Sequence, residues 1–341
     1  MNYIRNFKGW VASIVVLVVF ILIKLFSSND KEIVYQQSSG EKYTTFYNVQ
    51  YKYADNLSDS IALLLDKFDY SLSPFNCESL LTAINNNDTT VKADNLLIDV
   101  LTISGQVYKA TSGAFDPTIS PLINAWGFGF KTGTLPTDTE IEKLRKLVGM
   151  DKITLTSDGK VLKTDNNITL NFSAIAKGYI VDLIAGYLES KGITDYLVNI
   201  GGEISCRGVN ERGEEWRIGV DKPEESNIIG GDIETILKIS DKSLATSGNY
   251  RKFKVEDNKK VWHIIDPRTG YPTQARVLSA TVIADDCAIA DAYATALMVL
   301  GVEKGMPLIE ADSTLEALLI CPGDTSQYKL HYSKGFEKYL K

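Results

Sequence analysis

The alternation of apolar and polar residues along the chain predicts a mixture of short strands and amphipathic helices. A period near 3.6 residues predicts helices over residues 56–73, 93–113, 136–149 and 288–301. Alternating or short apolar runs predict strands over residues 43–53, 152–164, 195–209, 214–223, 244–255, 261–267 and 277–285. Residues 168–193 are predicted to form a strand and then a helix that ends at Gly192. Because no regular βαβ repeat is present, we predict an α+β fold, a single catalytic domain of two mixed subdomains.

Local signals set several of these boundaries. Asn56 or Ser58 is the expected cap of the first helix, and Gly149 is expected to close the third. The Asp158–Gly159 pair predicts a tight hairpin turn within residues 152–164.

The N-terminal part of the chain carries one apolar run with positive charge in front of it. Arg5 and Lys8 precede residues 10–23, a pattern found in cleaved signal peptides and in uncleaved membrane anchors. No small-residue cleavage site and no cysteine for a lipid follow, so we predict an uncleaved anchor whose positive end lies in the cytoplasm. We therefore divide the chain into anchor, polar tether and catalytic domain, residues 1–30, 31–40 and 41–341.

Composition and charge exclude several classes of function. The chain has 341 residues, a formal net charge of −7 and no basic run, which argues against a nucleic-acid partner. Four widely spaced cysteines form no CxxC pair, so a zinc ribbon or a disulfide scaffold is not expected. Only two histidines are present, which excludes the common zinc hydrolase sites. An anionic ligand would need a local device, namely a metal ion, backbone amides or a single placed cation.

The late helix "ADAYATALMVLG" offers a candidate metal site. Asp291 and Thr295 are four residues apart and therefore share one helix face. A carboxylate and a hydroxyl are hard oxygen ligands, which suit Mg²⁺ or Ca²⁺ rather than zinc. The alternative is that Asp291 caps the helix and Thr295 bonds back to a carbonyl of its own helix.

Another candidate lies at the predicted strand-to-helix junction "NFSAIAKGYIVD". Lys177 is surrounded there by Ala174, Ala176 and Gly178, at the start of a helix. A helix N-terminus favours anionic groups, and small neighbours would let such a group approach the backbone. The alternative is ordinary packing of a strand against a helix with a solvated lysine.

Two further residues, each considered by itself, could have either a structural or a functional role. Asp116 precedes Pro117, which is an ordinary N-cap arrangement, although it could also contact a polar heterocycle. His263 lies in the predicted apolar strand "VWHIIDP" and is either a core histidine or a general base. The segment "IGGEI" is interpreted as a flexible turn, and no Walker, GxGxxG or GxSxG motif is present.

Six motifs follow one another in a recognisable order: "SGAFDPTISPLINAWGFG", "NFSAIAKGYIVD", "LVNIGGEI", "ATSGNYRKF", "HIIDPRTGYP" and "CAIADAYATALMVLG". Together they resemble the ApbE family, the FAD:protein FMN transferases, over essentially all of residues 40–341. The resemblance implies an α+β fold and an exported protein held at the bacterial inner membrane, with its catalytic domain in the periplasm.

The resemblance also implies the roles of individual residues. Magnesium would be bound by Asp291, Thr295 and the backbone carbonyl of Ala174. The residues implied to line the FAD site are Phe75, which would stack on a ring, with Ala114, Phe115, Asp116, Asn171, Lys177, His263 and Ile265. Many members carry Met-Gly-Thr where this chain has Tyr43-Thr44-Thr45, which puts an FAD contact at Tyr43 in doubt.

The activity implied is a Mg²⁺-dependent transfer of FMN from FAD to a Thr or Ser hydroxyl of a flavoprotein subunit, with release of AMP. Asp291 would bind the metal, and His263 is our candidate base for the acceptor hydroxyl. Two rivals stay open at this stage. One is a Mg²⁺-dependent FAD pyrophosphatase that yields FMN and AMP, and the other is a non-catalytic flavin-binding membrane protein.

Overall fold

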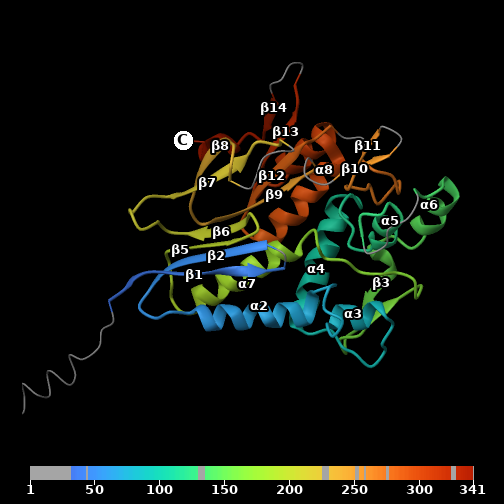
Figure 1. Ribbon diagram of the computed structural model, residues 1–341, viewed down its shortest axis with the longest axis horizontal. Coiled ribbons are helices and arrows are strands. Elements are labelled where there is room, and N and C mark those ends of the chain that lie inside the picture. Colours follow the sequence, from blue (N-terminus) through green and yellow to red (C-terminus); the bar gives the residue numbers. More distant parts are fainter. Residues whose placement is uncertain are drawn as a thin grey trace, which may run out of the picture.

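The computed structural model describes residues 32–43, 45–129, 135–224, 230–249, 253–256, 259–273, 276–323 and 328–340. Within these residues an eight-stranded sheet, with all neighbouring strands antiparallel, runs through the structure (Figure 1). In spatial order its strands are β1 (Val34–Lys42), β2 (Thr45–Tyr53), β5 (Tyr196–Ile200), β6 (Glu203–Arg207), β9 (Lys242–Gly248), β12 (Ser279–Ala284), β13 (Glu316–Pro322) and β14 (Tyr328–Tyr332).

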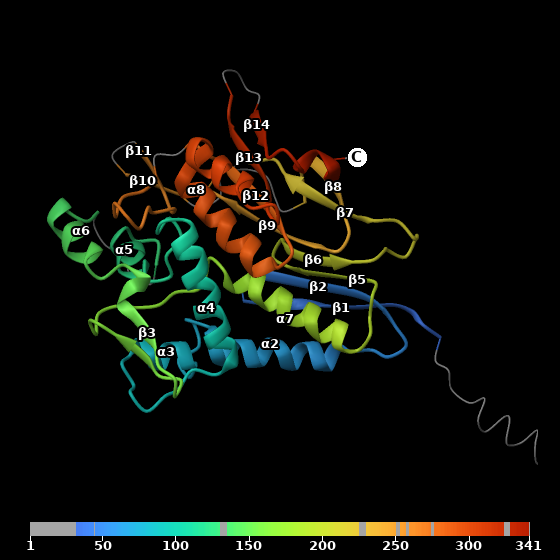
Figure 2. The ribbon, with the colours of Figure 1, turned by 180° about the vertical axis from the view of Figure 1, so that it is seen from behind.

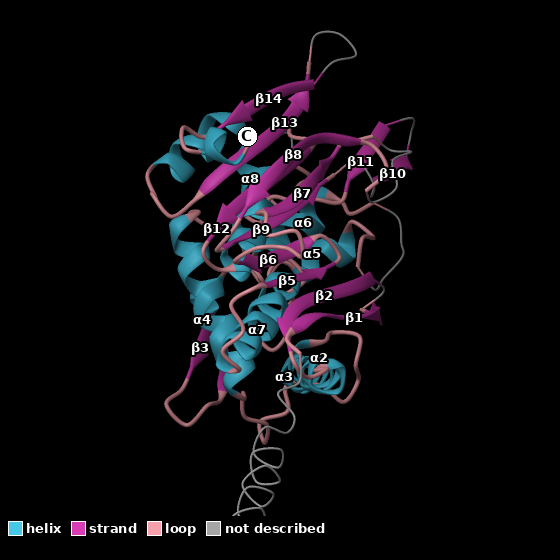
Figure 3. Ribbon diagram, turned by 90° about the vertical axis from the view of Figure 1, so that its left-hand side faces the viewer, coloured by secondary structure: helices cyan, strands magenta, loops and turns pink. Residues whose placement is uncertain are grey.

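Helices cover one face of this sheet (Figure 2). They are α2 (Ser58–Leu72), α7 (Ala176–Ser190) and α8 (Cys287–Glu310), with α4 (Asn95–Ala110) packed outside them against α8 and α2. On the other face lie the hairpin of β7 (Trp216–Asp221) and β8 (Ile233–Ile239) and the short helix η2 (Phe336–Tyr339). In Figure 3 the strands of the sheet follow one another from β14 and β13 at the top to β2 and β1 below.

Because both faces are covered, successive residues of the central strands enter different hydrophobic cores. In β5, Leu197 packs with the β7–β8 hairpin, whereas Val198 and Ile200 pack under the helices. In β13, Leu318 and Leu319 divide in the same way. The strands therefore read as continuous apolar runs rather than as alternating ones.

A smaller cluster of elements lies beside the sheet. It contains α3 (Leu80–Asn85), α5 (Ser120–Ala125), α6 (Asp138–Arg145), η1 (Met150–Lys152) and the hairpins β3 (Ile153–Leu155) with β4 (Val161–Lys163) and β10 (Phe253–Glu256) with β11 (Lys259–Trp262). Leu122 and Trp126 of the α5 region pack there against Ile141 and Ile265. Trp126 donates its indole N–H to the carbonyl of Gly270 at 2.8 Å, which attaches the loop after β11 to α5.

The α+β class and most predicted elements are confirmed, and a division into two subdomains stays a prediction. α4 is capped by Asp94, whose side chain accepts from Leu97 N–H, and α6 begins with a capping box of Thr137 and Glu140. The cap expected for α2 is wrong: Leu57 is the N-cap and makes no side-chain cap bond, while the side chain of Asn56 accepts from the N–H of Ser58 just before it. α8 extends beyond residues 288–301, but the positive φ of 71° at Gly301 breaks it into two helical segments.

The strand predicted before α7 is wrong. Leu170 and its neighbours alternate between buried and half-buried, yet no sheet ladder forms there. The side chain of Asn85 instead bonds both the N–H and the carbonyl of Leu170, at 2.8 and 2.9 Å, and Asn171 N–H donates to the carbonyl of Pro117. A side-chain amide thus satisfies buried backbone groups that a neighbouring strand would otherwise satisfy.

Two predictions about the N-terminal part of the chain have different outcomes. The tether expected over residues 31–40 is wrong from Val34 onward, because these residues form β1, the edge strand paired along its length with β2. The predicted membrane anchor, residues 1–30, lies outside the described residues. Among those that are described, α8 alone is long and apolar enough to cross a membrane, and it is instead packed into the core against α7, β9 and β12.

Candidate functional site

A cavity of about 460 Å³, within the usual range for small-molecule sites, opens beside the start of α7 and the middle of α8. Nearly all of the expected site residues line it: Ala114, Phe115, Asp116, Asn171, Ala174, Lys177, His263, Ile265, Asp291 and Thr295. They come from four separate stretches of the chain, residues 114–116, 171–177, 263–265 and 291–295. The fold therefore assembles the motifs that the sequence analysis singled out, and their roles stay predictions.

Phe75 is the exception. It lies in the turn between α2 and α3, where its side chain is 80% exposed, and it is not among the residues lining the cavity. Its N–H donates to the hydroxyl of Ser73, and Ser79 bonds back to the carbonyl of Ser73, so the turn is fixed by its own polar groups. The structure does not bring Phe75 to the other site residues. Tyr43 packs edge-on against Phe68 and donates its hydroxyl to the carbonyl of Leu65.

Gly178, one of the small residues next to Lys177, packs one helix against another, a contact that the sequence analysis did not predict. A Cβ added at Gly178 would lie 2.3 Å from the carbonyl oxygen of Cys287 and 2.8 Å from Cα of Ala288. α7 and α8 therefore meet backbone to backbone at this point. The close approach lets the N–H of Gly178 donate to Oδ2 of Asp291 at 3.1 Å, which places the Lys177 and Asp291 segments side by side.

A second contact locks the same two helices together. Asp182 of α7 accepts from the N–H groups of Cys287 and Ala288, at 2.7 and 2.8 Å, and so closes the N-terminus of α8. Burial, reinforced by the nearby Asp286 and Asp291, raises the pKa of Asp182 to about 7, although these two bonds favour the carboxylate. The capping role considered for Asp291 is thus wrong, because Asp182 holds the helix start and Asp291 lies a full turn inside it.

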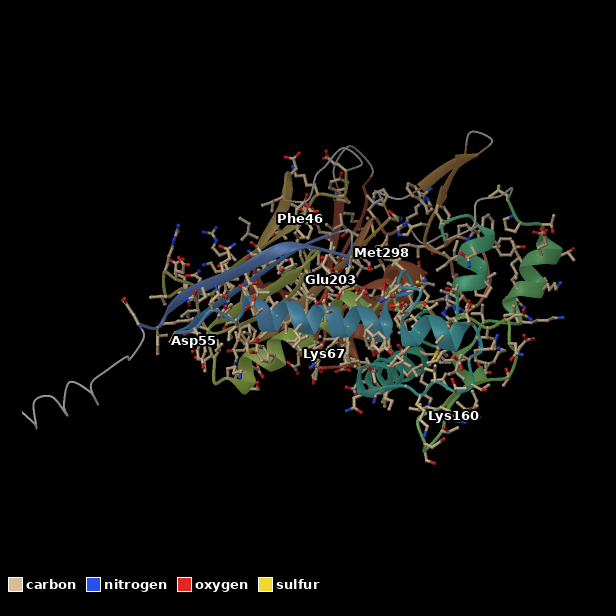
Figure 4. All side chains as sticks on the ribbon, turned by 60° about the horizontal axis from the view of Figure 1, so that its bottom comes forward. Phe46, Asp55, Lys67, Lys160, Glu203 and Met298 are labelled. Carbon is tan, nitrogen blue, oxygen red and sulfur yellow. The ribbon has the colours of Figure 1, made fainter. Side chains whose placement is uncertain are left out.

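Glu203 is the functional candidate that sequence analysis missed. It follows Gly201 and Gly202, both with positive φ, at the start of β6, and Figure 4 places it in the middle of the molecule. Its Oε1 forms an ion pair with the ammonium of Lys177, while its Oε2 has no hydrogen-bond partner among the described residues. The acid after two glycines in "IGGEI" was the signal available in the sequence, but nothing there indicated its pairing with Lys177.

The charges at the cavity are unbalanced. Asp291 and Glu203 are 3% and 2% exposed, and burial raises the pKa of both carboxyl groups, that of Glu203 to about 7, against the opposing effect of Lys177. Burial alone would lower the pKa of Lys177, but the same two carboxylates raise it. A buried charge without a partner is costly. Because the two carboxylates of Asp291 and Glu203 face a single ammonium among the described residues, that of Lys177, a further cation would be needed to balance their charge.

Three residues that line the cavity carry oxygen groups of the kind that such a cation needs. They are the carboxylate of Asp291, the hydroxyl of Thr295, and the carbonyl of Ala174, a set that suits Mg²⁺. The Thr295 hydroxyl lies 3.1 Å from that of Ser247 on β9, so it contacts a neighbouring strand of the sheet rather than bonding back along its own helix. No group of three or more acidic, histidine or cysteine side chains that could hold a metal occurs among the described residues. A metal here would therefore depend on the hydroxyl and the carbonyl as well as on one carboxylate.

Asp116 and His263 also line the cavity. One oxygen of Asp116 accepts from the N–H and the hydroxyl of Thr118, at 2.8 and 2.6 Å, which makes a turn before α5 rather than the helix cap itself. Burial raises the pKa of Asp116 to about 6, against these two bonds. His263 follows β11 instead of lying within a strand, and its ring meets Phe128 edge-on at 6.3 Å.

Comparisons with known proteins agree with this arrangement. The family model described as "ApbE family" matches residues 43–319. The FAD:protein FMN transferase of Vibrio cholerae is 34% identical over 95% of this chain and 98% of its own, and that of Escherichia coli K12 is 30% identical over 85% and 83%. Among solved structures, the flavin transferase ApbE from Vibrio cholerae covers 91% of this chain and 100% of its own at a TM-score of 0.79 and 34% identity. The apo flavinyl transferase ApbE of Pseudomonas stutzeri covers 92% and 98% at a TM-score of 0.79 and 27% identity.

Proposed function

The chain belongs to the ApbE family, and we propose on this premise that it is an FAD:protein FMN transferase whose active site is the cavity between α7 and α8. The acceptor's Thr or Ser oxygen forms a bond to the phosphorus of the FMN half, the pyrophosphate bridge breaks, and AMP leaves. The observation that carries the proposal is the meeting of Lys177, Asp291 and Thr295 in one cavity, on two helices whose backbones touch.

Each wall of the cavity has its own task. Lys177 faces the pyrophosphate and offsets charge on the transferring and leaving groups. Ala114, Phe115 and Asp116 hold a ring system against the α5 side, with Asn171 and Ile265 beside them. The Asp116 carboxyl presents a polar edge there, and the apolar neighbours exclude water from the ring.

Asp291, Thr295 and Ala174 fit a magnesium ion, which would supply positive charge to the pyrophosphate oxygens when bound. Two observations support this fit. All three donors are oxygen atoms, and two buried carboxylates, those of Asp291 and Glu203, face the single ammonium of Lys177. Asp291 is held ready by the N–H of Gly178, and Thr295 by the hydroxyl of Ser247.

His263 is the base that accepts the proton of the acceptor hydroxyl. It lines the cavity from the segment after β11, and Trp126 attaches Gly270 of the same segment to α5. A histidine-to-glycine variant of the Vibrio cholerae enzyme is among the similar solved structures, with a TM-score of 0.77. An imidazole suits proton transfer near neutral pH.

The predicted N-terminal anchor, residues 1–30, would hold the enzyme at the bacterial inner membrane with residues 41–341 in the periplasm. The acceptor would then be a flavin-carrying subunit of a membrane electron-transfer complex or an exported flavoprotein. This is the partner class that the family membership favours.

The decisive experiment incubates the enzyme and FAD with Mg²⁺, with and without a candidate acceptor protein. We expect AMP release that depends on the acceptor, and mass spectrometry should find FMN on a Thr or Ser of the acceptor. Free FMN and AMP without acceptor would favour the pyrophosphatase. Tight FAD binding without AMP release, unaffected by a chelator, would favour a non-catalytic flavin-binding protein.

A further inference from the structure

The active-site cavity contains a buried acceptor atom that no described protein group satisfies. Glu203 uses Oε1 to pair with Lys177, but Oε2 has no partner among the residues that the structure describes, although the side chain is 2% exposed. Buried polar atoms in native proteins are almost always hydrogen-bonded, because leaving one unpaired is costly. Oε2 therefore indicates a donor that belongs to the ligand.

The chemistry of a carboxylate restricts what this donor can be. In the ion pair with Lys177 the carboxylate of Glu203 is ionised and only accepts hydrogen bonds, so in this state the phosphate oxygens of a dinucleotide, which also only accept, cannot satisfy Oε2. Lys177 is paired with the same carboxylate and, in the proposed function, faces the pyrophosphate. The donor must therefore lie next to the pyrophosphate, where the two sugar segments of FAD carry hydroxyl groups.

The backbone next to Glu203 leaves space for such a group. Gly202 lines the cavity, and a Cβ added to it would meet nothing within 4 Å. The space beside Gly201, by contrast, is occupied, because a Cβ added there would lie 2.8 Å from the hydroxyl of Thr45. The residue directly before Glu203 therefore borders open space at the cavity.

We propose that Glu203 is a specificity-determining residue for FAD, in which Oε1 holds the ammonium of Lys177 and Oε2 accepts a hydrogen bond from a sugar hydroxyl beside the pyrophosphate. This inference rests on the proposed function. The hydroxyl belongs either to the ribityl chain of the FMN half or to the ribose of the AMP half, and the ligands used in the test distinguish these two sources.

The test compares the wild-type full chain with Glu203→Gln, whose amide keeps one oxygen for Lys177 but places an NH₂ donor where Oε2 was. Binding of FAD, FMN, AMP and inorganic pyrophosphate is measured by calorimetry. The matched control is Glu189→Gln, because Glu189 pairs with Arg207 at 2.9 Å and accepts from the hydroxyl of Tyr196, outside this cavity.

We expect Glu203→Gln to weaken FAD binding by about tenfold or more, since hydrogen bonds to charged groups are strong. Pyrophosphate, which has no sugar, should change by less than about threefold on the same reasoning. Whichever of FMN and AMP weakens together with FAD identifies the ribityl chain or the ribose as the donor. Glu189→Gln should bind all four ligands as the wild type does.

Equal weakening of FAD and pyrophosphate would overturn the inference, because Glu203 would then act only through Lys177. Unchanged FAD binding would overturn it as well. Should Glu203→Gln not fold, Glu203→Asp, which keeps the charge but withdraws the carboxylate by one methylene, must give the same ranking of ligands. A wild type that binds no FAD would overturn the proposed function and this inference together, and that result is read before any variant.

Discussion

Replacing Gly178 by alanine tests whether the contact between α7 and α8 builds the site. The new methyl group would lie 2.3 Å from the carbonyl oxygen of Cys287, so the two helices would have to separate by about 1 Å to reach ordinary contact. That movement would also withdraw the Gly178 N–H from Asp291, to which it now donates at 3.1 Å.

The magnitude follows from three effects. Overpacking costs about 1–3 kcal/mol, and loss of a hydrogen bond to a charged group costs about 1.5–3 kcal/mol. Alanine returns about 1 kcal/mol in helix propensity. We therefore expect Gly178→Ala to lower the free energy of unfolding by about 1.5–5 kcal/mol in urea titrations, and to reduce AMP release because Asp291 loses its position.

The same helix contains a matched control. A Cβ at Gly186 would meet nothing within 4 Å, so Gly186→Ala should raise the free energy of unfolding by up to about 1 kcal/mol and leave transfer activity unchanged. If Gly178→Ala proved as stable and as active as Gly186→Ala, the backbone contact would not be what positions Asp291.

Three further predictions concern single groups. Burial raises the pKa of Asp182 to about 7 in the folded state, above its unfolded value of 3.8, so its contribution to the free energy of unfolding falls as pH rises between these values. In urea titrations from pH 5 to 8, Asp182→Asn should therefore be less stable than the wild type at pH 5, and the difference in free energy of unfolding should narrow toward pH 8. A difference that widens with pH would contradict this. Asn85→Ala should lower the free energy of unfolding by about 2–4 kcal/mol, measured by denaturant titration, because both backbone groups of the buried Leu170 lose their partner. Asp291→Asn, or a chelator added to the wild type, should abolish AMP release. The unliganded variant should unfold at an unchanged or higher temperature, because a buried charge is removed. Undiminished turnover would show that Asp291 does not bind the metal.

The elements with strong local signals were predictable. Helices such as α4 and α6 carry both an amphipathic period and a capping side chain, Asp94 and Thr137, so the sequence around them specifies both type and boundary. The strand predicted before α7 was wrong for the opposite reason. Its alternating burial matches a strand, but its hydrogen bonds are made by the distant side chain of Asn85, which no local pattern indicates.

The residues that line the cavity could be singled out for a similar reason, and their roles stay predictions, whereas Glu203 was missed because no local pattern marks it. The four-residue spacing of Asp291 and Thr295 places them on one helix face and so marks them as a pair. The order of the motifs, which resembles that of a known family, indicated Lys177, Asp116 and His263. Glu203 has no such pattern, because its importance arises only when β6 lies beside α7 and the carboxylate meets Lys177 in a buried place.

The sequence by itself determined the mixture of strands and helices, the hard-oxygen donors on the late helix and the family to which the chain belongs. These depend on residue types at short, fixed spacings, which a chain carries whatever its fold. Only the tertiary structure decided that Gly178 serves a helix contact, that the carboxylates exceed the cations facing them, and that one oxygen of Glu203 has no described partner. Burial and the pairing of charges are properties of what surrounds a residue, and residues far apart in the chain supply those surroundings.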